Sequence, residues 1–153
     1  GGVVLGIEDR KALAEAFANL ADRFTGKDAA FILQEQKPTG REIIIGATES
    51  PGLGHLVMFG LGGVFVEVMK DVAFALAPLS HPEARTLMRS IKGFPILEGV
   101  RGEAGADLEA VEELLLRVSR MVADNPSITE LDLNPILATP DGASAVDVRL
   151  KVR

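Results

Sequence analysis

The sequence contains no cysteine, tryptophan or tyrosine. The lack of cysteine excludes disulfides, thiolate nucleophiles and cysteine-ligated metals, and it fits a reducing compartment. No apolar stretch reaches the roughly 18–20 residues that a membrane span requires, because charged or turn residues interrupt every long one. No charged-then-apolar leader opens the chain. We therefore expect a cytoplasmic protein with no membrane partner.

A basic stripe is also missing. The net charge is −6, with 16 basic and 22 acidic residues mixed along the chain, so a nucleic-acid partner is not expected. The 153 residues, 47% of them hydrophobic, suffice for the core of one domain. The chain enters directly on a β-type run at Gly1-Gly2-Val3 without an initiator methionine, and we expect a fragment of a longer polypeptide.

Three segments have the signals of helices. Asp9 precedes apolar residues spaced by three and four, which predicts an amphipathic helix ending before Gly26. Ser80 and Glu83 have capping-box spacing, and the helix that they open should run to about residue 92. Asp107 begins the clearest helix, which should end at Asn125-Pro126.

The remaining runs predict strands. Residues 29–34 and 41–46 are expected to form adjacent antiparallel strands, and residues 55–60 and 64–69 a hairpin around a glycine-rich bend. Residues 72–76 should add a strand, and residues 128–133 and 136–138, separated by a break at Pro135, should pair with residues 145–151 as a closing hairpin. The predicted fold class is α+β, with a mostly antiparallel sheet and helices packed on one face of it.

Three oxygen-bearing side chains are candidate metal ligands. Asp132 and Asn134 have the same parity in one predicted strand and should share a face, which Asp147 would join from the partner strand. Leu131 and Leu133 alternate with them toward the core. Two carboxylates and an amide, with room left for water and phosphate, suit a nucleotide-bound Mg²⁺. Spacing alone leaves open the alternative that these residues simply make a solvated strand face.

The glycine-rich bend, one arginine and the two histidines are further candidates for chemistry. The glycines at 60, 62 and 63 lack the Lys-Ser/Thr ending of a P-loop, which favours a tight hairpin over a phosphate cradle. Arg101 is a candidate catalytic residue whose planar fork would clamp a phosphate or carboxylate, with a structural ion pair as the alternative. The histidines, His55 and His81, are expected to be solvated, and neither fits a Ser-His-Asp set.

Several longer runs resemble a known family. They are 41–46 (REIIIG), 57–67 (VMFGLGGVFVE), 70–74 (KDVAF), 99–102 (GVRG), 130–135 (ELDLNP) and 147–149 (DVR), together with the GGV start. In this order they resemble the C-terminal part of the ATP-grasp domain of the NDP-forming acyl-CoA synthetases. That group contains ADP-forming acetate–CoA ligase and, more distantly, the β subunit of succinyl-CoA synthetase.

The resemblance implies specific roles. Asp132, Asn134 and Asp147 would hold the Mg²⁺ that bridges the phosphates of ATP or ADP, Gln34 would begin the hinge that receives adenine, and Glu35 and Glu42 would contact the nucleotide. In such enzymes acyl-CoA, ADP and phosphate are reversibly converted to acid, CoA and ATP through an acyl phosphate and a phosphohistidine. The metal would neutralise phosphate charge and position the transferred group.

The resemblance also implies partners. The N-terminal lobe with its phosphate-binding lysine and the CoA-binding and ligase domains are expected in the same protein or in a separate subunit, with acyl-CoA as substrate and an oligomer as the assembled form. The sequence around His55 departs from the family pattern, so no role is assigned to it. The alternative is a regulatory, synthetase-like module of a protein lysine acetyltransferase. On either reading, residues 1–153 are expected to be a single ATP-grasp-type lobe that is inactive alone.

Overall fold

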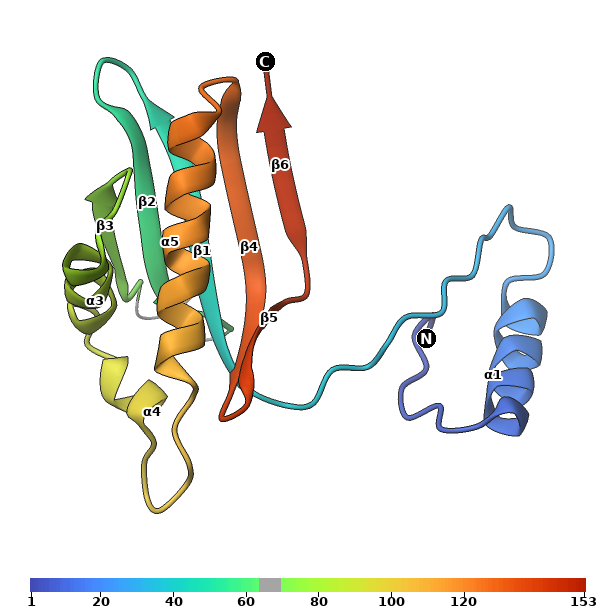
Figure 1. Ribbon diagram of the computed structural model, residues 1–153. Coiled ribbons are helices and arrows are strands. Elements are labelled where there is room, and N and C mark those ends of the chain that lie inside the picture. The colour runs from blue at the N-terminus through green and yellow to red at the C-terminus, as the bar shows by residue number, and fades with distance from the viewer. Residues whose placement is uncertain (64–69) are drawn as a thin grey trace. The chain divides into compact units, whose positions relative to one another are not determined.

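The computed structural model describes residues 1–63 and 70–153, which divide into two compact units, Gly1–Pro38 and Thr39–Arg153. We call them the first and second units. The first unit contains α1 (Arg10–Arg23), whose first turn is capped as expected: the Asp9 carboxylate accepts a hydrogen bond from the Ala12 amide at 2.7 Å. Two extended stretches flank this helix (Figure 1).

The second unit is built on one antiparallel sheet (Figure 1). Its strands are β1 (Arg41–Ser50), β2 (Gly54–Leu61), β3 (Val72–Leu76), β4 (Ile128–Thr139), β5 (Gly142–Ala145) and β6 (Val148–Val152). The spatial order is β3-β2-β1-β4-β5, and β6 also pairs with β4. β5 and β6 share one edge of β4, because β5 pairs with its second half and β6 with its first half.

Helices of the second unit lie on one face of this sheet, where α5 packs against β1, β2 and β5 (Figure 1). They are α3 (His81–Arg89), α4 (Phe94–Glu98) and α5 (Leu108–Asp124). The predicted caps are present: Ser80 and Glu83 form the capping box of α3, and the Asp107 side chain accepts from the Glu109 and Ala110 amides. The short helix α4 was not predicted. The core lies between the sheet and these helices, with Phe59, Leu97 and Leu115 fully buried in it.

One strand prediction is wrong. Residues 29–34 form no strand, and they belong to the first unit, whereas residues 41–46 begin β1 of the second. β1 already pairs with β2 along one edge and with β4 along the other, so no edge is left for the predicted neighbour. Local β-type composition identifies an extended segment but cannot say which edge it will find.

Two further predictions concern the strand around Pro135 and the second arm of the glycine-bend hairpin. β4 runs through Pro135 without the predicted break, and the closing strand is divided instead, into β5 and β6. Proline has no N–H to donate, and the pairing of β4 with its outer neighbours changes at this point. Residues 64–69, the predicted second arm of the glycine-bend hairpin, lie outside the described residues; the described neighbours of β2 are β1 and β3.

The fold class is confirmed: a mostly antiparallel sheet carries helices on one face in an α+β arrangement. In the described part of the chain, no helix combines the length and the apolar character needed to cross a bilayer.

Candidate functional site

The candidate metal ligands lie on the sheet face opposite α3 and α5, which we call the outer face. Leu131 and Leu133 are buried in the core on the helix side, so the alternation of β4 directs Asp132 and Asn134 to the outer face. The predicted parity is thus present in the structure. Asp132 is half-buried and Asn134 is exposed.

Asp147 meets this pair from the neighbouring chain segment. The backbone N–H of Asn134 donates to the carbonyl of Asp147 at 3.1 Å, directly beside the point where Leu133 pairs with Val148. Asp147 therefore lies opposite Asn134, and Asn134 is two residues from Asp132 along β4. The structure brings the three predicted residues together, although their role as metal ligands stays a prediction.

Arg149 is a fourth member that the sequence reading missed. It pairs across the strands with Asp132, and its Nε lies 3.8 Å from a carboxylate oxygen of Asp147. A guanidinium between two carboxylates reduces their mutual repulsion. The spacing of Asp147 and Arg149 carried this signal, because residues two apart in a strand share a face.

Electrostatics at Asp132 favour a bound cation. Burial raises the pKa of the Asp132 carboxyl; the positive charge of Arg149 acts in the opposite direction, and the negative charges of Glu130 and Asp147 raise the pKa further. A carboxylate that is costly to ionise by itself becomes stable when a cation neutralises it. The site thus suits a positively charged ligand.

The donor set fits Mg²⁺ in one particular form. Among residues 1–63 and 70–153, no three His, Cys, Asp or Glu side chains are grouped closely enough to hold a metal on their own. Two carboxylates and one amide leave several coordination positions for water and phosphate oxygens. Mg²⁺ is usually bound this way when it accompanies a nucleotide. The arrangement fits a metal that arrives with its phosphates better than a permanent protein cage.

A shallow pocket of about 180 Å³ adjoins Asp132 on the outer face. Its apolar side is made by Leu56, Met58 and Phe74, and Phe74 is 57% exposed. Gly46 lies between this side and Asp132, and a Cβ there would come within 3.2 Å of the methyl group of Met58. The pocket therefore offers an apolar surface beside the carboxylates.

Glu42, a predicted nucleotide contact, lies against the glycine pair at the end of β2. The Gly62 N–H donates to the Glu42 carbonyl at 2.7 Å, and a Cβ at Gly62 would stand 2.9 Å from that of Glu42. Gly63 has a positive φ of 59° beside the Glu42 carboxylate. Glycine is needed here for close chain packing and for a left-handed backbone, which explains the motif without a phosphate.

The other predicted contacts are divided between the units. Gln34 and Glu35 belong to the first unit, where Gln34 lines a pocket of about 390 Å³ and Glu35 accepts from Lys37 Nζ at 2.9 Å. Arg101 belongs to the second unit, in the exposed loop between α4 and α5, with a positive φ of 54°. Its role as a phosphate clamp and the alternative of a structural ion pair both stay predictions.

The expectation for His55 is wrong. It lies on β2 and is only 6% exposed, and its Nε2 makes a 2.7 Å hydrogen bond with the carbonyl of Ile128. Burial follows from its odd position in β2, which faces the helices together with Val57 and Phe59. A structural role accounts for this histidine. His81, by contrast, exposes most of its side chain, as expected.

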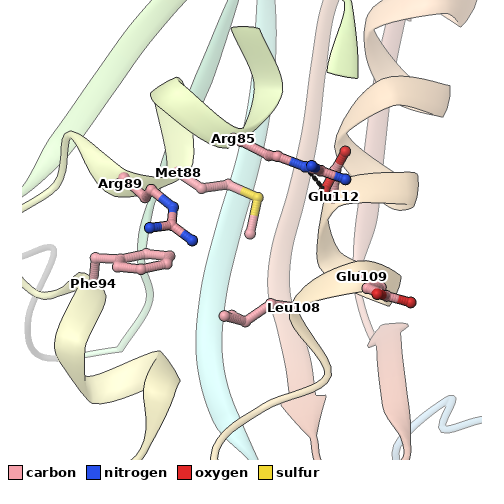
Figure 2. A pocket seen from close by; sticks show the side chains of 7 residues that line it. All are labelled: Arg85, Met88, Arg89, Phe94, Leu108, Glu109 and Glu112. Carbon is pink, nitrogen blue, oxygen red and sulfur yellow. Dashed lines mark hydrogen bonds and ion pairs between the residues drawn. The ribbon is translucent and has the colours of Figure 1, made fainter. Parts of the chain in front are cut away.

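Sequence reasoning also missed a polar cluster on the helix side (Figure 2). Glu112 of α5 is buried, and its two oxygens accept from Arg85 Nε and His81 Nδ1, each at 2.8 Å. The sequence pattern places Glu112 on the solvent face of this helix, and that expectation is wrong: the side chain lies on the buried face of α5, beside Val111 and Leu115. These two hydrogen bonds connect α3 to α5. The hydrogen bond from Arg85 lowers the pKa of Glu112 from its ordinary value, and the hydrogen bond from His81 adds to the effect.

We expect a Glu112→Gln variant to lose roughly 1–2 kcal/mol of unfolding free energy at pH 7, toward the lower end of the scale for hydrogen bonds to charged groups because Arg85 and His81 are mostly exposed. Because the folded-state pKa of Glu112 is lowered, the contribution is full above the unfolded value of 4.5 and is lost as the pH falls below it. Urea unfolding at pH 7 and at pH 3 measures this. Glu113→Gln, which removes the exposed pair with Arg117, is the control and should cost below about 0.5 kcal/mol. Equal losses in both variants at both pH values would contradict the assignment.

Comparison with known proteins decides the family. A family model described as an ATP-grasp domain matches residues 1–152. The chain belongs to the ATP-grasp domain family. Subunit β of ADP-forming acetate–CoA ligase I from Pyrococcus furiosus is 41% identical over 155 residues, 98% of this chain and 67% of that protein. ADP-forming acetate–CoA ligase I from Archaeoglobus fulgidus is 40% identical over 98% of this chain, but the match covers only 22% of the ligase.

Solved structures agree. The dinucleotide-forming acetyl-coenzyme A synthetase 1 of Ca. Korarchaeum cryptofilum, in complex with coenzyme A and Mg-AMPPCP, superposes with a TM-score of 0.87 at 38% identity. The superposition covers 99% of this chain and 68% of that one. The same synthetase with a phosphorylated phosphohistidine segment also gives 0.87. The predicted resemblance to the NDP-forming acyl-CoA synthetases is confirmed, and this ATP-grasp chain spans only part of such enzymes.

Proposed function

We propose that this chain is the nucleotide-binding part of an ADP-forming acid–CoA ligase, in which acyl-CoA, ADP and phosphate are reversibly converted to acid, CoA and ATP. The observation that supports this most directly is the convergence of Asp132, Asn134 and Asp147 on the outer face of the sheet. The similarity to acetate–CoA ligases supports the same reaction. An acyl phosphate and a phosphohistidine would carry the phosphoryl group between the parts of the whole enzyme.

In this proposal Asp132, Asn134 and Asp147 hold the Mg²⁺ that accompanies ATP or ADP. The metal supplies neutralisation of phosphate charge and a fixed orientation for transfer. Arg149 balances the carboxylates before the nucleotide arrives. Arg101, exposed in its loop, would clamp a phosphate by its planar fork.

The nucleotide base is assigned to other residues. Gln34 and Glu35 would receive adenine, and Glu42 would contact the nucleotide from the start of β1. We also propose that residues 1–153 form a single ATP-grasp-type lobe of a longer protein, consistent with one family model over residues 1–152. CoA-binding and ligase domains, in the same chain or in another subunit, would complete an oligomeric, cytoplasmic enzyme, and the lack of cysteine suits that compartment.

The intact protein tests the proposal by calorimetric titration with ATP, with and without Mg²⁺, and by formation of ATP from acyl-CoA, ADP and phosphate. We expect tight binding only with Mg²⁺ and formation of ATP in step with release of CoA. Binding of ATP that is indifferent to Mg²⁺ would refute the metal assignment. Mg²⁺-dependent binding without any ATP formation by the intact protein would favour the regulatory module of a lysine acetyltransferase instead.

A further inference from the structure

Three residues of β6 have both exposed apolar side chains and backbone groups that β4 does not pair. β6 pairs with β4 alone among the described strands, and in Figure 1 it stands at the edge of the sheet, clear of α5. Val148, Leu150 and Val152 are each more than half exposed, although their β4 partners, including Leu131 and Leu133, are buried in the core. An apolar strip thus continues the core face of the sheet beyond the cover of the helices.

The backbone of these three residues also faces outward. Asp147 and Arg153 make hydrogen bonds with the β4 side, through the Asn134 amide and the Ser127 carbonyl. Since the polar groups of successive strand residues point to opposite edges, the odd residues of β6 bond to β4 and the even residues point away from it. Within the second unit, the N–H and C=O groups of Val148, Leu150 and Val152 are therefore available to another strand. Such an edge is a template for strand addition.

Charge restricts what can be added. Arg149 and Lys151 alternate with the apolar residues and project from the outer face, where β4 opposes them with Asp132 and Glu130. A second copy of β6, paired antiparallel to the first, would place these bases beside their own counterparts, which is unfavourable. A strand that carries Asp or Glu at alternate positions would instead give each base an acidic neighbour on both sides.

We propose that the free edge of β6 docks an extended segment of the partner ligase domain or subunit, in which apolar residues alternate with carboxylates. The partner strand would cover Val148, Leu150 and Val152 with its apolar side chains and extend the sheet by main-chain hydrogen bonds. This proposal rests on the proposed function, because that function requires the partner. It assigns an assembly surface to the helix-facing side of β6, whereas the metal residues occupy the outer face.

Hydrogen exchange on the intact protein, resolved to single amides, tests the proposal. The amides of Val148, Leu150 and Val152 should exchange at least about 100-fold more slowly than an unpaired edge, as expected for hydrogen bonds within a packed sheet, and independently of protein concentration. Exchange at the rate of an open edge would overturn the proposal. Protection that rises with concentration would assign the edge to a second copy and overturn it too.

A charge reversal supplies the second measurement. Lys151→Glu places an acid against the expected carboxylates and should lower the protection of Leu150 and Val152 by about tenfold or more. Lys151→Arg, the matched control, should preserve it. Unchanged protection in Lys151→Glu would contradict an acidic partner. Mg²⁺-dependent ATP binding, measured on the same samples, separates the two proposals. If the unaltered protein does not bind ATP in a Mg²⁺-dependent way, the proposed function is wrong. If ATP binding is retained and only the amide protection of β6 differs from expectation, the docking proposal alone is wrong.

Discussion

Replacing Asp132 with asparagine is expected to lower acyl-CoA-dependent ATP formation by the intact protein by about 10²–10³-fold. A metal supplies several kcal/mol of charge stabilisation in phosphoryl transfer, and each 1.4 kcal/mol corresponds to about a factor of ten in rate. Asparagine keeps the size and one oxygen of the side chain but removes the negative charge. It also removes the group whose pKa burial raises, so the folded protein should not be destabilised.

The same experiment extends to the other two candidates. Asn134→Ala and Asp147→Ala should each weaken Mg²⁺-dependent ATP binding, and part of the loss should be recovered at high Mg²⁺ concentration, because each variant removes only one ligand. Glu130→Gln is the matched control: Glu130 lies on the same strand and face but pairs with Lys151, so its variant should keep near-normal turnover. Normal ATP affinity and turnover in all three site variants would refute the metal assignment.

The features predicted correctly from the sequence are those set by neighbouring residues. Asp9, Ser80 and Asp107 lie at the starts of helices, and a cap acts on amides only two or three residues away. The common face of Asp132 and Asn134 follows equally from strand alternation. Helix caps and strand alternation involve only residues close together in the chain, so both can be predicted from a single sequence.

The features missed depend on residues far apart in the chain. Residues 29–34 have strand composition, yet both edges of β1 are occupied by segments that begin 13 and 87 residues after Arg41. Burial of His55 depends on the Ile128 carbonyl, which no local pattern reveals. Glu112 occupies an apolar helix face because α3 brings Arg85 and His81 to it. In each case the strand pairing or the burial depends on a contact with a residue distant in the sequence, and local sequence patterns do not identify such contacts.

Tertiary packing also predicts the largest effect on stability. Phe59 is fully buried on β2, between Ile45 of β1 and Ala73 of β3, and faces the helices from the middle of the core. A Phe59→Ala variant should lose about 3–5 kcal/mol, since both the buried surface and the filled volume disappear. At roughly 4 °C per kcal/mol for a domain of this size, the melting temperature should fall by about 12–20 °C.

Phe74→Ala is the matched control, because it removes the same ring from the adjacent strand on the outer face, where Phe74 is 57% exposed. It should lower the unfolding free energy by less than about 1 kcal/mol, the usual range for an exposed substitution.

Differential scanning calorimetry of the intact protein, with and without Mg-ATP, separates the two roles. Phe59→Ala should be destabilised in both conditions. If the pocket beside Asp132 receives nucleotide, Phe74→Ala should instead show a smaller stabilisation by Mg-ATP, because a ligand stabilises in proportion to its affinity for the folded state. Similar losses for both phenylalanines without nucleotide would contradict the placement of the core on the helix side of the sheet.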